Sequence, residues 1–266
     1  MSPLSVTETP AVLYALRRAD DALVLGHRLS EWIGHGPTLE EEMALGNTGL
    51  DLMGQARSLY QYAASAEAAG HDEDQYAFLR DAPQYRNLLL VEQPNGDFAH
   101  TMVRQLFYSA FADPYWRAMM RSADPALAAI AAKSEKESAY HVRHASEWVI
   151  RLGDGTAESH ARAQDAVDTL WPYTGELFEP DPDLPNPDLP DSGLPDSGVN
   201  GALVDPASVR DAWNATVGSV LLRATLRVPD GTWMQSGGRS GRHSEHLGPL
   251  LALMQHTHRA FPGAKW

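Results

Sequence analysis

The chain has 266 residues, of which 43% are apolar and 21% are charged, and its formal net charge is −14. A chain of this length can bury a sizeable core, and its composition is typical of a globular protein. The negative charge argues against nucleic acid or an anionic membrane surface as the main partner, and the absence of cysteine excludes disulfides, thiolate metal ligands and thiol nucleophiles.

Helical periodicity dominates the chain, and the two-residue alternation that would indicate strands is nearly absent. Capping residues, glycine and proline mark where helices begin and end. The expected helices cover residues 10–33, 39–69, 74–80, 97–122, 124–152, 156–178, 205–226 and 244–259. Four of them are long, and most connections between them are short. We therefore predict an all-α protein built as a long four-helix bundle with additional shorter helices.

Residues 180–204 differ from the rest because they are rich in Pro and Asp and poor in apolar side chains. Such a segment cannot bury enough surface to fold alone. The part of the chain beyond it is too short for an independent core. We therefore predict a single domain over residues 1–266 that carries a loop insertion at about 180–204.

The helix expected at 124–152 carries the most informative pattern. Asp124 is a suitable N-cap, Pro125 suits the first helical position, and Gly153 is expected to end the helix. The spacing predicts an inner stripe of Ile130, Lys133 or Ser134, Glu137, His141, His144 and Trp148. A carboxylate and an imidazole one turn apart in such a stripe can hold a metal ion, or can form a buried polar pair.

Four long helices with inner polar residues invite comparison with the di-iron carboxylate template. That template takes a carboxylate from each of two helices and a Glu-x-x-His motif from each of the other two. Candidates in helix order are Asp20, His27 and Glu31, then Asn47, Asp51 and Gln55, then His100 and Arg104, then Lys133, Glu137 and His141. The match is incomplete: Glu137 and His141 are four apart, and Ser138 stands three before His141. We also expect Arg104 and Lys133 to point at the centre, bringing cations where iron would lie.

Other motifs give weaker signals. His243-Ser-Glu-His246 is expected to open the last helix, where it could bind metal or place Glu245 against the helix dipole. The loop at 237–242, GGRSGR, superficially resembles a phosphate cradle but lacks the strand and the Lys-Ser/Thr of a P-loop. It could instead be a flexible basic loop. Three glycines at 46, 49 and 54 in the second helix indicate close packing of another helix.

No signal-peptide pattern opens the sequence, and no apolar run approaches the roughly 18 residues that a membrane span requires. We therefore expect a cytoplasmic protein without a membrane partner.

Several long blocks resemble the PaaC-type structural subunit of the phenylacetyl-CoA epoxidase. They include GHRLSEWIGHGPTLEEEMALGNTGLDLMGQA within 23–64 and KESAYHVRHASEWVIRLGDGT at 136–156. Further blocks lie at 87–105, 170–179 and 243–255. Together they cover nearly the whole chain and are highly specific.

The resemblance implies a ferritin-like bundle in a multicomponent oxygenase of aerobic phenylacetate degradation, which converts the ring of phenylacetyl-CoA to a 1,2-epoxide. It implies no cofactor in this chain. The di-iron centre is expected in a catalytic sister subunit, and electrons come from NADPH through a reductase with FAD and an iron–sulfur cluster. The expected partners are that sister subunit, the reductase and small accessory subunits. Glu31, Asp51, Glu137 and His141 are then degenerate site positions rather than metal ligands, and Trp32 is the expected interface residue.

Three functions remain open from the sequence: a scaffold subunit that supports a di-iron oxygenase, an autonomous ferritin-like di-iron protein that uses its own residual ligands, and a binding module for a CoA thioester. Iron content, dependence of activity on a partner, and CoA binding by the isolated chain distinguish them.

Overall fold

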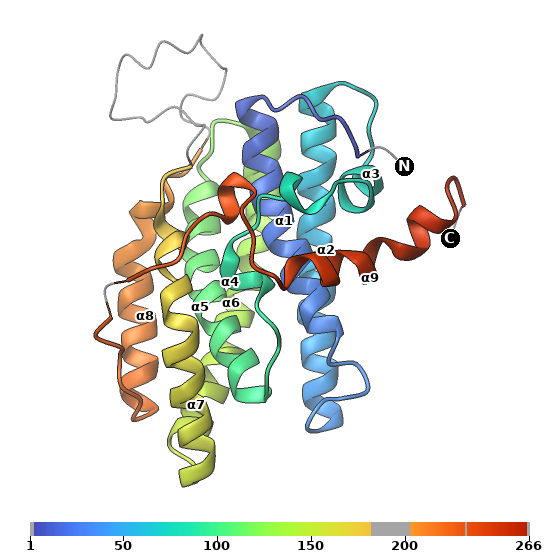
Figure 1. Cartoon of the computed structure of the whole chain (residues 1–266). Coiled ribbons are helices and arrows are strands. Elements are labelled where there is room, and N and C mark those ends of the chain that lie inside the picture. Colours follow the sequence, from blue (N-terminus) through green and yellow to red (C-terminus); the bar gives the residue numbers. More distant parts are fainter. Residues whose placement is uncertain (1–2, 182–202, 232, 265–266) are drawn as a thin grey trace. The chain divides into compact units, whose positions relative to one another are not determined.

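The computed structural model describes residues 3–181, 203–231 and 233–264, and these contain helices and no strands (Figure 1). The predicted all-α class is confirmed. The loop insertion expected at about 180–204 lies almost entirely outside the described residues. The α-helices are α1 (Pro10–Ser30), α2 (Leu39–Glu67), α3 (Glu73–Phe78), α4 (Leu89–Glu92), α5 (Phe98–Met119), α6 (Pro125–Gly153), α7 (Ala157–Leu170), α8 (Arg210–Arg223) and α9 (Leu247–Ala260).

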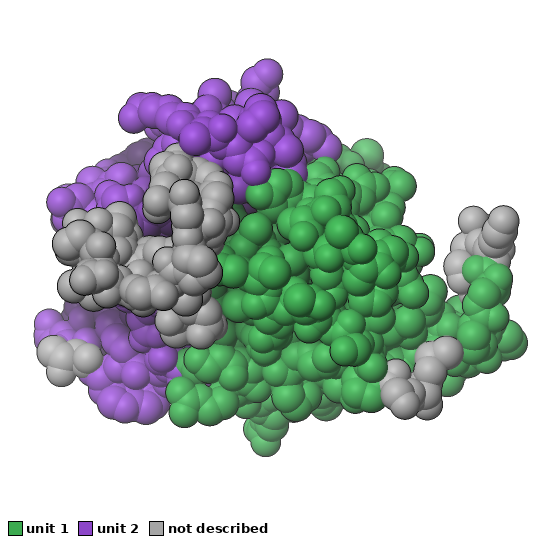
Figure 2. All heavy atoms as spheres, turned by 90° about the horizontal axis from the view of Figure 1, so that it is seen from above, with its two compact units in different colours: residues 1–94, 181–184, 237–266 green, residues 95–180, 185–236 purple. Residues whose placement is uncertain are grey.

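The described residues group into two compact units (Figure 2). Unit 1 lies within residues 1–94 and 237–266, together with Asp181, and unit 2 lies within residues 95–180 and 185–236. The four long helices expected of a ferritin-like fold are all present. Unit 1 holds α1 and α2, and unit 2 holds α5 and α6.

Unit 1 is built around α1, which is buried on every side because 17 of its 21 residues are buried. Thr9 caps its first turn, and Thr38 caps α2 by accepting a hydrogen bond from Glu41 N. The two helices cross where glycine meets glycine. A Cβ atom at Gly26 would lie 3.1 Å from the carbonyl oxygen of Gly49, so the close packing predicted for the second helix occurs at this crossing.

Unit 2 is organised by α5, which is also largely buried, and by α6 packed against it. Asp97 and Asp124 cap these helices through their carboxylates. An aromatic cluster anchors α8 to α5, and within it the Trp213 indole donates a 2.8 Å hydrogen bond to the carbonyl oxygen of Phe107. Trp171 and Phe178 complete this cluster through ring contacts with Trp213.

Several helix ends differ from the sequence expectation. Gly153 is the last residue of α6 rather than the residue that stops it, and a Cβ atom there would lie 2.3 Å from Ala224 O. The role of this glycine is therefore close packing beside α8. α7 ends at Leu170, eight residues before the expected end at 178, because Pro172 lies in the 3₁₀ turn that follows it. α9 begins at Leu247, three residues later than expected, and α4 was missed.

Within the described ranges, no helix is both long enough and apolar enough to cross a bilayer.

Candidate functional site

Two of the four predicted site positions, Glu31 and Asp51, lie in unit 1, and the other two, Glu137 and His141, lie in unit 2. Glu31 follows the last residue of α1, is exposed, and pairs with Arg28 through Nη1 and Oε1 at 3.0 Å. Asp51 lies in the middle of α2 and is half-buried. Trp32, the expected interface residue, is half-buried in the turn after α1.

Glu137 and His141 both lie on α6, where His141 is buried and Glu137 is half-buried. Glu137 pairs with Lys133 at 3.6 Å. The Lys133 side chain is 64% exposed, so the expectation that this cation points inward is wrong. The buried stripe of α6 is Leu127, Ala131, Ser134, Ser138, His141, Ala145, Val149 and Gly153. It includes Ser134 and His141 as predicted, and it omits Ile130, Glu137, His144 and Trp148.

The facing helix α5 adds no buried carboxylate or imidazole to His141. Its fully buried polar residues include Arg104 and Gln105, and none of its buried residues is Asp, Glu or His. His100 is half-buried, and burial lowers its pKa. Arg104 is buried as expected and donates to Asn95 Oδ1 at 2.6 Å.

These donors do not fit a di-iron centre. Such a centre needs several carboxylate oxygens and imidazole nitrogens converging on two metals. His141 is the one fully buried Asp, Glu or His side chain on α5 and α6, and the position one turn before it is a serine. In the described part of the chain, no three or more such side chains gather in a way that could hold a metal ion.

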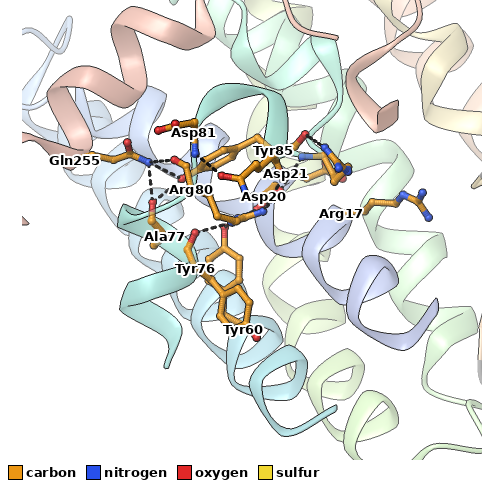
Figure 3. A network of polar contacts seen from close by, with 12 residues as sticks. Arg17, Asp20, Asp21, Tyr60, Tyr76, Ala77, Arg80, Asp81, Tyr85 and Gln255 are labelled. Atoms are coloured by element: carbon orange, nitrogen blue, oxygen red, sulfur yellow. Dashed lines mark hydrogen bonds and ion pairs between the residues drawn. The ribbon is translucent and has the colours of Figure 1, made fainter. Parts of the chain in front are cut away.

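A buried polar network in unit 1 uses carboxylates that sequence reasoning did not bring together (Figure 3). At its centre, Asp20 of α1 accepts from Tyr60 Oη at 2.6 Å and from Arg86 N at 2.8 Å. Arg80 pairs with both oxygens of the same carboxylate. Asp20 and Arg80 are fully buried, and Arg80 also packs over the ring of Tyr85.

Asp21, the next residue of α1, holds a second arginine. Arg239 donates to its two oxygens at 3.0 and 2.7 Å, and Leu88 N donates at 2.8 Å. Arg239 belongs to the glycine-rich loop at 237–242, for which the sequence left open a flexible basic loop. Its guanidinium is instead buried, and a Cβ atom at Gly238 would lie 2.1 Å from the carbonyl oxygen of Asn87.

Glu92 of α4 forms the third buried centre. Its oxygens accept from Ser244 N at 2.6 Å, from Asn87 Nδ2 at 2.9 Å and from His243 Nδ1 at 2.8 Å. His243 Nε2 faces Tyr85 O at 3.0 Å, so both ring nitrogens of His243 lie within hydrogen-bond distance of an oxygen. His243 therefore ties the segment before α9 to α4 and does not open a helix.

The electrostatics of the network are those of mutually neutralised buried charges. Burial acts to lower the pKa of Arg80, but the adjacent Asp20 carboxylate, together with Tyr60 and Tyr85, outweighs burial and raises the pKa, so Arg80 stays charged. Burial raises the pKa of Tyr60, which keeps its phenol protonated as the donor to Asp20. Burial also raises the pKa of Asp21, and Arg239 and Arg18 oppose that rise.

This arrangement leaves little acceptor capacity for a ligand. Asp20, Asp21 and Glu92 each accept several hydrogen bonds from side chains and backbone of the same unit. The network therefore fixes α1, α4 and the segments at 80–88 and 239–244 to one another. Sequence spacing could not reveal it, because its arginine–aspartate pairs and the His243–Glu92 pair join residues far apart in the chain.

The sequence of the chain is similar to those of known proteins over nearly its whole length. Residues 3–266 match the family model described as phenylacetic acid catabolic protein. The chain is 47% identical over 253 residues to the C subunit of the 1,2-phenylacetyl-CoA epoxidase of Escherichia coli (strain K12), an alignment that covers 95% of this chain and 98% of that protein. The alignment covers nearly the full length of both chains, so the resemblance to the C-type subunit of the phenylacetyl-CoA epoxidase that the sequence blocks indicated is confirmed. The chain belongs to the phenylacetic acid catabolic protein family.

Proposed function

We propose that this chain is the non-catalytic structural subunit of a phenylacetyl-CoA epoxidase, which supports a catalytic sister subunit during aerobic phenylacetate degradation. The family match and the full-length similarity to the Escherichia coli epoxidase component support the complex to which it belongs. The possible metal-ligand side chains of its long helices support a non-catalytic place in that complex.

The single observation that carries the non-catalytic role is the composition of the buried faces of α5 and α6. These faces hold Arg104, Gln105, Ser134 and Ser138 beside His141. A guanidinium repels a metal cation, and an amide or a hydroxyl is a far weaker ligand than a carboxylate. A chain with this donor set contributes no oxygen-activating metal, so the proposal assigns the di-iron centre to the sister subunit.

Electrons reach the sister subunit from NADPH through a reductase with flavin and iron–sulfur centres, and small accessory subunits complete the assembly. The cytoplasm is the proposed location. The task of this chain is to keep a stable shape against which its partner is held, and the neutralised network around Asp20 supports that task because it stabilises unit 1 without a bound metal.

Two measurements test this function. The chain purified alone from iron-supplemented medium is expected to hold close to no iron by elemental analysis. Epoxidation of phenylacetyl-CoA by the sister subunit, its reductase and accessory subunits is expected to require addition of this chain. Iron near two atoms per isolated chain would favour an autonomous di-iron protein, and activity that is independent of this chain would contradict the scaffold role.

A further inference from the structure

An exposed apolar stripe runs along the outer face of α2 in unit 1. Leu39, Met43 and Leu50 are 69%, 60% and 70% exposed, respectively. Their spacing of four and seven residues places them on one side of the helix, over about 16 Å at 1.5 Å per residue. Large apolar side chains aligned and exposed in this way mark an interaction surface more often than isolated exposed residues do.

A glycine with open space beside its Cα atom lies in the middle of the stripe. Gly46 falls on the same side of α2 as Met43 and Leu50, and a Cβ atom built on it would meet no atom of the described residues within 4 Å. By contrast, Gly49 faces Gly26 at the crossing with α1. One glycine of this helix is thus explained by close packing inside unit 1, whereas Gly46 leaves a notch on the outer face that could admit a side chain or backbone of another chain.

The charge around the stripe indicates what kind of surface covers it. Positions 29–56 contain no Lys or Arg and five acidic residues, namely Glu31, Glu40, Glu41, Glu42 and Asp51. By helical geometry Glu40 flanks the stripe on one side and Glu42 on the other. An acidic rim around an apolar centre is complementary to a partner with the opposite rim. A second copy of this chain would set one acidic rim against another and is disfavoured, as is an anionic membrane surface.

We propose that the outer face of α2, from Leu39 to Leu50, is the docking surface for the catalytic sister subunit, and that the sister subunit presents a helix with apolar residues flanked by Lys and Arg. This inference rests on the proposed function, because it assigns the surface to the partner that the function requires. The apolar side chains supply the buried centre of the contact, and the glutamates set its orientation and speed its formation.

A matched pair of substitutions tests the surface. Leu50→Lys places a cation at the C-terminal end of the stripe, whereas Leu253→Lys places the same cation on α9 of the same unit, at a leucine that is 74% exposed. The full chain and each variant are titrated against the purified sister subunit by isothermal calorimetry. Leu50→Lys is expected to raise Kd at least tenfold and Leu253→Lys to change it less than twofold. Met43→Lys provides a second variant in the stripe, and thermal unfolding verifies that all three are folded.

Salt dependence tests the charge argument separately. Raising NaCl should weaken wild-type binding, and the double variant Glu40→Gln with Glu42→Gln should show a shallower dependence on salt. A wild-type chain that binds the sister subunit with the same Kd as Leu50→Lys and Met43→Lys would overturn the docking surface and leave the proposed function in place. A wild-type chain that does not bind the sister subunit at all would overturn both. A homodimer that Leu50→Lys converts to a monomer would assign the stripe to a second copy and overturn the proposed occupant.

Discussion

Replacing Asp20 with asparagine tests whether the buried network holds unit 1 together. Asp20 and Arg80 are both fully buried, and the carboxylate also accepts from Tyr60 and from Arg86 N. Asparagine keeps the volume but removes the charge that neutralises Arg80. An arginine guanidinium stays protonated in proteins at neutral pH, so Arg80 cannot escape the loss of its partner by losing its proton. Removing one partner of a buried ion pair costs about 3–5 kcal/mol, because the other charge stays buried and uncompensated.

The assay is urea unfolding at pH 7 followed by circular dichroism, with thermal unfolding beside it. For a chain of this size, a loss of that order corresponds to a Tm lower by about 6–20 °C. The matched control is the pair of Arg57 and Glu73, also in unit 1, at 3.0 Å with the Arg57 side chain 70% exposed. Arg57→Gln should cost less than about 1 kcal/mol, because exposed ion pairs are screened by water and salt.

The double variant Asp20→Asn with Arg80→Met is the internal check on this reasoning, because the amide oxygen can still accept a hydrogen bond from Tyr60. It removes both charges together and is expected to recover much of the stability lost in Asp20→Asn. An Asp20→Asn protein within about 1 kcal/mol of wild type would refute the argument, because it would mean that Arg80 finds compensation elsewhere.

Three further predictions concern packing, pH and iron. In the isolated chain, Gly26→Ala should lower the free energy of unfolding by about 1–3 kcal/mol, because its new methyl group meets the α2 backbone. Gly46→Ala should raise the free energy of unfolding by up to about 1 kcal/mol. Equal urea midpoints for the two variants would contradict this prediction. Burial raises the pKa of Glu67, but hydrogen bonds, foremost from Tyr76, outweigh it and lower the pKa below the usual 4.5. The stability that Glu67 contributes is therefore present above pH 4.5 and lost as the pH falls. Glu67→Gln should lower the free energy of unfolding, measured in urea, at pH 7. The difference from wild type should become smaller in acid, and a larger difference would contradict the prediction. His141→Asn should leave the iron content of the reconstituted complex unchanged, whereas loss of iron would make His141 a ligand.

The positions of most helices could be predicted from the sequence because the residues that start a helix act locally. Thr9, Thr38 and Asp124 each cap a helix that begins at the next residue, since a side-chain oxygen satisfies backbone donors within three residues of itself. Gly153 shows the limit of such rules. A glycine at a helix end suggested a stop, but the constraint on it comes from Ala224, 71 residues later, which no local rule contains.

The inner face of α6 was only partly predictable for a related reason. Lys133 and Ser134 are adjacent, and a period of 3.6 residues allows either to face inward on a helix of this length. The partner helix decides, and it buries Ser134 while the Lys133 side chain remains exposed. The incomplete ligand pattern was nevertheless visible, because Ser138 stands where a Glu-x-x-His motif needs its carboxylate.

The buried network was beyond sequence reasoning because charged residues are rarely buried unless they are paired, and the pairs here are remote. Arg80 lies 60 positions from Asp20, and Arg239 lies 218 positions from Asp21. Two adjacent aspartates in the first helix were a usable signal. They point in different directions on α1, so each needs its own cation once the helix is buried on all sides.

The contacts of α1 link the interior of unit 1 to the docking surface proposed on α2. α1 is surrounded, and the two arginines that meet its aspartates tie the segments at 80–88 and 239–244 to it. α2 also contributes to this interior, because Tyr60 donates to Asp20 while Gly49 meets Gly26. The exposed stripe from Leu39 to Leu50 is thus carried by a helix that contacts α1 at two further points. A surface held in this way is preorganised, so binding loses less conformational entropy than docking onto a mobile helix would. Asp20→Asn should therefore weaken binding to the sister subunit as well as lowering stability, although Asp20 lies far from the stripe in sequence and is itself buried.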